Sequence, residues 1–227
     1  MTERRDHARQ SSGAREETVR ACLSVVVAVA IVCVSRSALA QVQPSPAVAT
    51  LVLADGIVYV DEKSVGPITG PFHLPDVIVL RTMQGRAAVA LKRGGWLFLD
   101  AESSVHVRGN GVYNLNRLEV LSGSVIVASE TSEPLVDCES EVRLSSAGLF
   151  RFDAQSRDAS GERPCRLRVY EGGAAVPLLT VTNALRPGQS MMCDRRCGDM
   201  IPTREFSPTQ LDEFDQWARR AQQQLKK

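Results

Sequence analysis

The chain has 227 residues, of which 44% are hydrophobic and 23% are charged, and its formal net charge is +1. These values are typical of a globular protein with a hydrophobic core and exclude an intrinsically disordered chain. The near-neutral charge provides no field that would attract nucleic acid, so no nucleic-acid partner is expected. Aromatic residues make up only 5% of the chain. The core must therefore be built mainly from Val, Leu, Ile and Ala, which favours many short strands.

The first forty residues have the pattern of an export signal. A polar stretch with five arginines precedes apolar and small residues over 21–34, and Ala38 and Ala40 provide a cleavage site before Gln41. Fourteen helical residues span about 21 Å, less than the roughly 30 Å hydrocarbon core of a membrane. We therefore expect residues 1–40 to be a cleaved signal peptide and the protein to be periplasmic or secreted. The alternative is an uncleaved N-terminal anchor in the inner membrane, with the rest of the chain facing the periplasm.

Four cysteines follow residue 40, namely Cys138, Cys165, Cys193 and Cys197. An even number of cysteines in an exported protein predicts disulfides. Three pairings are possible. We favour Cys138 with Cys165 and Cys193 with Cys197, because each pair is the nearest in sequence. Loss of the first forty residues, with their six arginines and four acidic residues, would leave a formal charge of about −1.

The next part of the chain predicts a linker and then an all-β domain. Residues 41–49 include two prolines and no apolar periodicity, which indicates a linker. Over residues 50–190, apolar runs of four to eight residues alternate with turns rich in Gly, Asn, Asp or Pro, as in a succession of short strands. The runs at 118–121 and 125–127 flank Ser122 and Gly123, so they predict either a hairpin or two adjoining rungs.

Several of these strands alternate apolar residues with arginines, namely Arg143, Arg151, Arg166 and Arg168. A period of two places one face of a strand in the core and the other in solvent. We therefore expect these arginines on a solvated outer face, where charge also discourages association through strand edges.

The C-terminus predicts a loop over residues 191–206 and one amphipathic helix over 207–227. Ser207 can cap this helix, with Pro208 in its first turn and Gln210 completing a capping box. An apolar stripe recurs every three or four residues, formed by Leu211, Phe214, Ala218, Ala221 and Leu225, with Trp217 beside it. We expect the stripe to pack on the β domain. The alternative is a docking helix that leaves Phe214 and Trp217 exposed for a partner, while Arg195 and Arg196 in the loop could bind an anion.

The sequence offers no recognisable catalytic, metal or cofactor motif. The chain beyond residue 40 has two histidines, His73 and His106, and neither belongs to a triad pattern. Cys193 and Cys197 have no second Cys or His pair at zinc-ligand spacing. No glycine-rich phosphate or dinucleotide fingerprint is present. We therefore expect a protein that is not an enzyme and that uses no cofactor and no metal.

The order of glycines and apolar blocks resembles the FecR domain. The resemblance is carried by residues 56–60 (Gly-Ile-Val-Tyr-Val), 85–91 (Gly-Arg-Ala-Ala-Val-Ala-Leu), 94–99 (Gly-Gly-Trp-Leu-Phe-Leu) and 185–189 (Leu-Arg-Pro-Gly-Gln). Further similar blocks lie at 80–82, 118–127, 145–152 and 169–176. The resemblance implies a β-solenoid-like or rolled sheet of short strands that acts in the bacterial cell envelope without catalysis.

Two departures from the family narrow what the resemblance implies. Iron-transport regulators of this type have a helical anti-sigma region before their membrane span, whereas only twenty polar residues precede the apolar run here. Their additional C-terminal signalling domain is replaced by the cysteine-containing loop and one helix. We therefore predict a stand-alone exported FecR-like protein that binds or scaffolds an envelope protein or polymer. The alternatives are a membrane-anchored signal-transduction component and an envelope hydrolase whose acidic residues form no visible motif.

Overall fold

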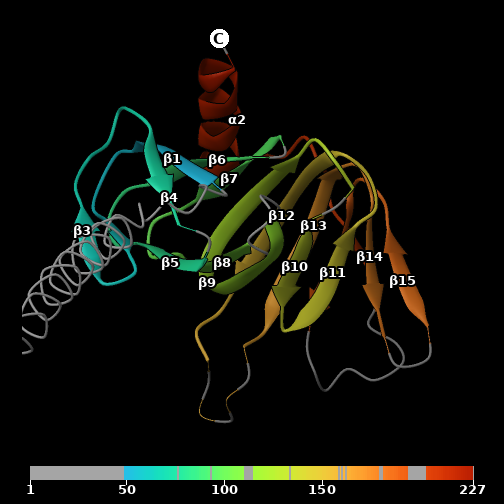
Figure 1. Cartoon of the computed structure of the whole chain (residues 1–227). Coiled ribbons are helices and arrows are strands. Elements are labelled where there is room, and N and C mark those ends of the chain that lie inside the picture. The colour runs from blue at the N-terminus through green and yellow to red at the C-terminus, as the bar shows by residue number, and fades with distance from the viewer. Residues whose placement is uncertain are drawn as a thin grey trace, which may run out of the picture. The chain divides into compact units, whose positions relative to one another are not determined.

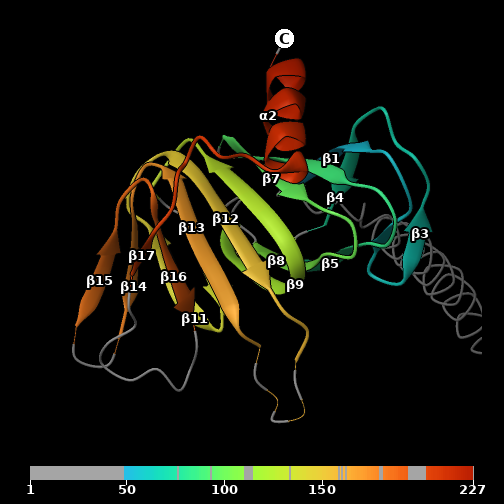
Figure 2. The same ribbon diagram turned by 180° about the vertical axis from the view of Figure 1, so that it is seen from behind.

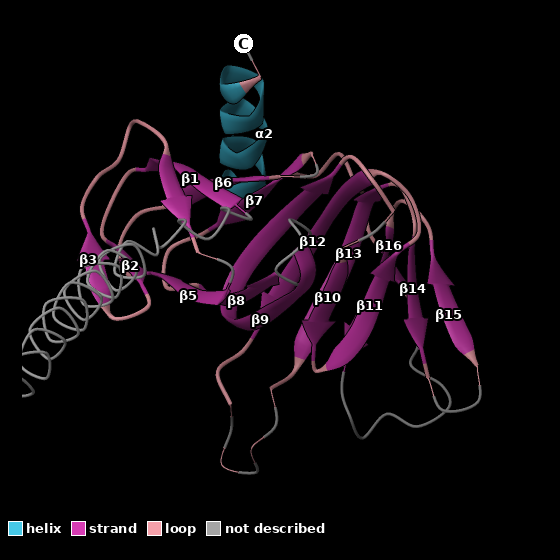
Figure 3. Ribbon diagram, viewed as in Figure 1, coloured by secondary structure: helices cyan, strands magenta, loops and turns pink. Residues whose placement is uncertain are grey.

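The apolar runs of the sequence form seventeen strands, all short except β9 (Leu115–Ser129), which has fifteen residues. A single helix among the described residues follows them (Figure 3). The computed structural model describes residues 49–75, 77–92, 94–109, 115–132, 134–157, 159, 161, 163–178, 181–193 and 203–226. The strands form one continuous open sheet that is folded into two layers. The prediction of an all-β fold made of short strands with one C-terminal helix is confirmed.

One layer, here called the helix-side sheet, has nine strands that are all paired antiparallel. Their spatial order is β4 (Phe72–Leu74), β1 (Ala49–Ala54), β6 (Ala87–Leu91), β7 (Gly95–Leu99), β9 (Leu115–Ser129), β12 (Gly148–Ala154), β13 (Cys165–Glu171), β16 (Gln189–Cys193) and β17 (Arg204–Glu205).

The other layer, here called the opposite sheet, also has nine strands and shares β9 with the first. Their spatial order is β3 (Lys63–Val65), β2 (Val58–Val60), β5 (Val77–Thr82), β8 (Ser104–Gly109), β9, β10 (Leu135–Cys138), β11 (Ser140–Leu144), β14 (Ala174–Pro177) and β15 (Thr182–Leu185). The β9–β10 pair is parallel, and the other neighbouring pairs of this layer are antiparallel. Successive strands thus pass back and forth between the layers, as in a rolled sheet (Figures 1 and 2).

Strand β9 connects the two layers through a bend at Gly123. Its first half pairs with β8 in the opposite sheet, and its second half pairs with β7 and β12 in the helix-side sheet. Gly123 has φ +80°, and a Cβ atom there would lie 2.6 Å from the Cα of Ser103. Only glycine accepts that conformation and that close approach. Of the two alternatives expected here, the hairpin is wrong, because the glycine bends one long strand instead of closing a turn.

The main core lies between the two sheets and is built mostly from aliphatic side chains, as the composition predicts. Leu51, Val89 and Leu97 of the helix-side sheet and Leu80 and Val107 of the opposite sheet belong to the same buried cluster. Phe150 and Phe152, both on β12, are its largest members. Alternate residues of each strand contribute, because successive side chains of a strand point to opposite faces.

The structure contains the predicted disulfide between Cys138 on β10 and Cys165 on β13, which joins the opposite sheet to the helix-side sheet. Cys193, which was expected to pair with Cys197, is instead a free, buried thiol. It pairs across the sheet with Cys165, which is already bonded to Cys138. Burial raises the pKa of the Cys193 thiol to about 12, so it stays protonated and unreactive at neutral pH. Cys197 lies outside the described residues.

The C-terminal helix α2 spans Glu213–Leu225, so it begins later than predicted. Asp212 is its N-cap: its side chain accepts from the backbone N–H of Asp215, whose side chain accepts in turn from the backbone N–H of Asp212. Ser207 and Gln210 instead close a turn through a backbone hydrogen bond of 3.1 Å. The expected loop over 191–206 is also partly strand, because β16 extends to Cys193 and β17 pairs with it.

Some expectations fall on parts of the chain that the structure does not describe. These are the export signal over residues 1–40, the linker up to residue 48, and Arg195 and Arg196. Within the described residues, no helix combines the length and the apolar character needed to cross a membrane.

Candidate functional site

Helix α2 packs on the outer face of the helix-side sheet, where it forms a second apolar cluster (Figure 1). Phe214 is 2% exposed, and Ala218 and Ala221 are also buried. Trp217 is partly buried, and its ring meets that of Phe98 on β7 edge-on at 6.0 Å. The expected packing of the stripe on the β domain is therefore observed. Neither Phe214 nor Trp217 is presented as a free docking surface.

A buried polar network fixes the start of α2 to β12. Arg151 lies beneath the helix with its side chain 7% exposed, and its guanidinium contacts the carboxylates of Asp153 at 2.8 Å and Asp215 at 3.0 Å, and also that of Asp212. The hydroxyl of Tyr170 donates to Asp215 at 2.9 Å. The expectation of a solvated Arg151 is wrong, because α2 covers the face of β12 that the alternation alone assigns to solvent. Arg143 and Arg166 are exposed as expected.

The network shifts the proton affinities of its members. Burial alone would lower the pKa of Arg151, but attraction to Asp153 and Asp215 outweighs burial and raises it, so the cation is permanent. Burial, followed by the negative charge of Asp215, raises the pKa of Tyr170 to about 12. For Asp212, burial acts to raise the pKa, but the backbone N–H of Asp215 and the charge of Arg151 lower it overall.

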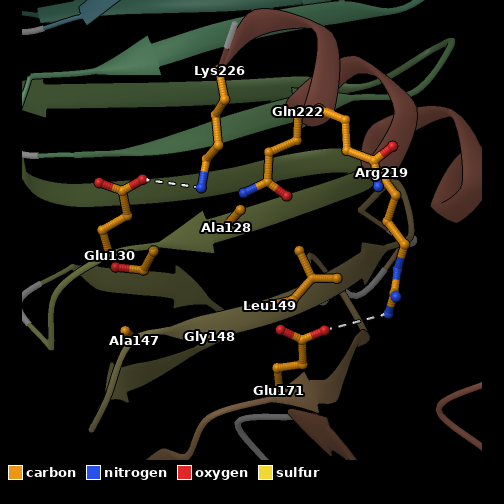
Figure 4. Close-up of a pocket in the computed structure, with 11 residues that line it drawn as sticks. Ala128, Glu130, Ala147, Gly148, Leu149, Glu171, Arg219, Gln222 and Lys226 are labelled. Atoms are coloured by element: carbon orange, nitrogen blue, oxygen red, sulfur yellow. Dashed lines mark ion pairs between the residues drawn. The ribbon is translucent and has the colours of Figure 1, made fainter.

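A groove of about 570 Å³ opens beside the second half of α2 (Figure 4). We call it the helix groove. Its lining comes from the end of β9, the turn into β12, the end of β13 and α2, and consists of Ala128, Ser129, Glu130, Ala147, Gly148, Leu149, Glu171, Arg219, Gln222, Gln223 and Lys226. Its volume falls within the range of small-ligand sites.

Two glycines let the floor of the groove form. A Cβ atom on Gly148 would lie 2.1 Å from the carbonyl oxygen of Glu171. Gly172 has φ +82°, and its Cβ would lie 2.4 Å from the carbonyl oxygen of Ala147. Without side chains at these positions, the turn before β12 and the end of β13 come together. The floor is therefore formed by closely approaching backbone together with Ala128, Ala147 and Leu149.

Charged side chains bracket the groove at both ends, as Figure 4 shows. Lys226 lies 3.4 Å from Glu130, and Arg219 lies 3.7 Å from Glu171. All four side chains are one-third or more exposed. The Nε atom of Arg219 is buried and makes no hydrogen bond to any described acceptor. Pairs of this kind contribute little to stability and exchange readily for other partners.

The histidines lie on strands away from the lining of the groove. His73 on β4 is exposed and exchanges a hydrogen bond of 3.2 Å with Thr50. His106 on β8 lies 3.5 Å from Glu119 and accepts from the Nε of Arg108 at 3.2 Å. The described residues contain no group of three His, Cys, Asp or Glu side chains placed to hold a metal ion.

Reasoning from the sequence missed the helix groove entirely. Its charged residues are ordinary surface types that come from three separate segments, so no local spacing indicates them. The one available signal was the pair of glycines at 148 and 172, since a glycine at a strand end can mark a close backbone approach.

Comparison with known proteins gives few matches. No protein-family model matches the chain, and no curated protein matches it. The FecR resemblance therefore stays a prediction. Two crystal structures of a proposed anti-sigma factor from Parabacteroides distasonis are similar, each at 16% identity, with TM-scores of 0.47 and 0.46. They cover 58% and 57% of this chain, which in turn spans about three-fifths of their length, 61% and 60%.

Proposed function

We propose that this chain is an exported, non-catalytic binding protein of the bacterial cell envelope, and that the helix groove is where it binds its partner. The observation that carries the proposal is the groove itself: charged and amide side chains from α2 face strand ends across a small-residue floor. The strands form a rigid support, and binding residues at the ends of such elements are well positioned.

The chemistry of the lining favours binding over catalysis. Ser129 is the one hydroxyl among the lining residues, and it donates to the carbonyl oxygen of Thr131 at 2.6 Å. A nucleophilic serine needs a base within hydrogen-bond distance, and neither His73 nor His106 lines the groove. The carboxylates of Glu130 and Glu171 face cations, which suits recognition of charged groups.

The proposal is tested by photo-crosslinking in the cells that make the protein. A photoreactive amino acid replaces Gln223, which lines the groove, or Gln224, which is the next residue of the same helix and does not. Both side chains are exposed, so the two variants are matched in reactivity and accessibility. We expect a discrete crosslinked product from position 223 and none from position 224. Equal products from both positions, or none from either, would overturn the proposal for the groove.

Export is tested on the same preparation by mass spectrometry of the N-terminus. A first residue at Gln41 in the periplasmic or secreted fraction would support an exported protein with a cleaved signal. An intact Met1 in the membrane fraction would instead support the membrane-anchored alternative.

A further inference from the structure

The spacing of charges along α2 defines a length for the ligand of the helix groove. Arg219 and Lys226 are seven residues apart, close to two helical turns, so they share one face of the helix. At about 1.5 Å per residue, they are separated by about 10 Å along the axis. Three residues of an extended peptide span about the same distance, at roughly 3.3 Å each.

The charges at the two ends of the groove are of both signs. Each end holds one cation from α2 and one carboxylate from the sheet, Lys226 with Glu130 and Arg219 with Glu171. The four charges sum to zero, so a ligand with a single charge can form an ion pair at one end of the groove only. A ligand with opposite charges at its two ends can pair with both ends at once.

Arg219 is suited to take the negative end. Its Nη2 atom contacts Glu171 at 3.7 Å, which is too long for a strong hydrogen bond, so this nitrogen can take a closer acceptor from a ligand. A carboxylate beside a guanidinium accepts two parallel hydrogen bonds, which a single distant carboxylate does not provide. Glu130, whose pair with Lys226 is exposed, is then available for the positive end.

The middle of the groove suits a peptide backbone with small side chains. Ala128, Ala147 and Leu149 form an apolar floor, and Gln222 points from α2 toward the strands (Figure 4). A primary amide offers both donors and an acceptor, which match the N–H and C=O groups of a peptide. The small floor residues Ala128 and Ala147 let a peptide backbone approach the strands closely.

We propose that the helix groove binds a short extended peptide of about three residues, with its carboxylate on Arg219 and its ammonium group on Glu130. This inference rests on the proposed function and names the ligand of the same groove.

The test is a titration of the ¹⁵N-labelled exported protein with Ala-Ala-Ala, followed by NMR. Three matched probes accompany it: N-acetyl-Ala-Ala-Ala, which lacks the positive charge, Ala-Ala-Ala-amide, which lacks the negative charge, and free alanine, which is too short. We expect Ala-Ala-Ala to bind with a Kd on the order of 1 mM. The amide shifts should cluster at residues 128–130, 147–149, 171 and 219–226. Each of the other probes should bind at least about tenfold more weakly.

Two single substitutions assign the ends. Arg219→Gln should lower the affinity for Ala-Ala-Ala about tenfold, to the affinity for Ala-Ala-Ala-amide. The control is Arg220→Gln, because Arg220 is an exposed neighbour that does not line the groove, and this variant should keep the wild-type affinity. Glu130→Gln should reduce Ala-Ala-Ala to the affinity of the N-acetyl probe. If Arg219→Gln does not fold, the Glu130→Gln variant still tests the inference at the other end of the groove.

Equal affinity for the charged and the blocked peptides, or shifts outside the groove, would overturn the inference. A crosslink from position 223 together with no binding of Ala-Ala-Ala would reject the ligand class and retain the proposed function. Binding of Ala-Ala-Ala without a crosslink in cells would retain the groove chemistry and reject the proposed function.

Discussion

The guanidinium of Arg151 is held by three carboxylates, those of Asp153, Asp212 and Asp215, beneath the start of α2. Arg151 and Asp215 are the two buried ions, and burial of either would be costly without its partner. The ring of Phe214 lies over the same guanidinium, with its centroid 5.4 Å away. One side chain therefore ties the helix to the sheet by charge and by contact with an aromatic face.

Replacing Arg151 by leucine should strongly destabilise the fold. Asp215 would remain 3% exposed with its cationic partner removed, and loss of one partner of a buried ion pair costs about 3 to 5 kcal/mol. Urea denaturation measures the change in the free energy of unfolding. Arg143→Leu is the matched control, because Arg143 also alternates on a strand but is 66% exposed beside Glu141. Its loss should cost about 1 kcal/mol or less. Similar losses for the two variants would contradict the assigned role of Arg151.

The residue pattern predicts that the side chain of Arg151 points away from the main core, but it does not predict that α2 buries this side chain. Arg143 and Arg151 alternate with apolar residues at the same period. They differ because α2, which follows β17, covers Arg151 and leaves Arg143 exposed. Because α2 covers β12, the outer face there becomes a second interior. The same limit applies to Cys193: the count of cysteines predicts pairing, but the strand register places Cys193 beside a disulfide that is already closed.

At the scale of the element, α2 does not begin at the predicted Ser207-Pro208 start. The structure places the N-cap at Asp212, which accepts from the backbone N–H of Asp215 and also contacts Arg151 across the interface. The apolar stripe and its packing could be predicted from period alone, whereas the first residue of the helix depended on a partner 61 positions earlier in the chain.

The cap of α2 makes the stability of the protein sensitive to acid. The pKa of Asp212 is lower in the folded protein than its ordinary value of 3.8, so its charge stabilises the fold above that value. This contribution is lost as the pH falls below about 3.8 toward the folded pKa. Asp212→Asn preserves a good cap but removes the charge. The difference in unfolding free energy between wild type and Asp212→Asn, measured in urea, should be constant above about pH 5 and shrink below pH 4. A difference that stays constant down to pH 2 would contradict this role.

At the scale of the whole molecule, β9 and the Cys138–Cys165 disulfide both join the two layers. The strand does so through the backbone and the disulfide through side chains that are fully buried in the shared core. The rolled arrangement agrees with the short-strand composition, in which turns follow every few apolar residues. The helix groove could not be predicted at this scale either, since it exists only where four segments meet.

The disulfide should account for a large share of the thermal stability. Its cysteines are separated by 27 residues, for which loop-closure entropy predicts about 3 to 4 kcal/mol. For a domain of this size, that corresponds to a fall in Tm on the order of 10 °C on reduction, measured by circular dichroism with and without a reductant. Cys193→Ala should show the same fall, because its thiol is free, whereas Cys138→Ala combined with Cys165→Ala should show none. If Cys193→Ala abolishes the effect of the reductant, then Cys193 belongs to the disulfide in solution, and the pairing across the two sheets is wrong.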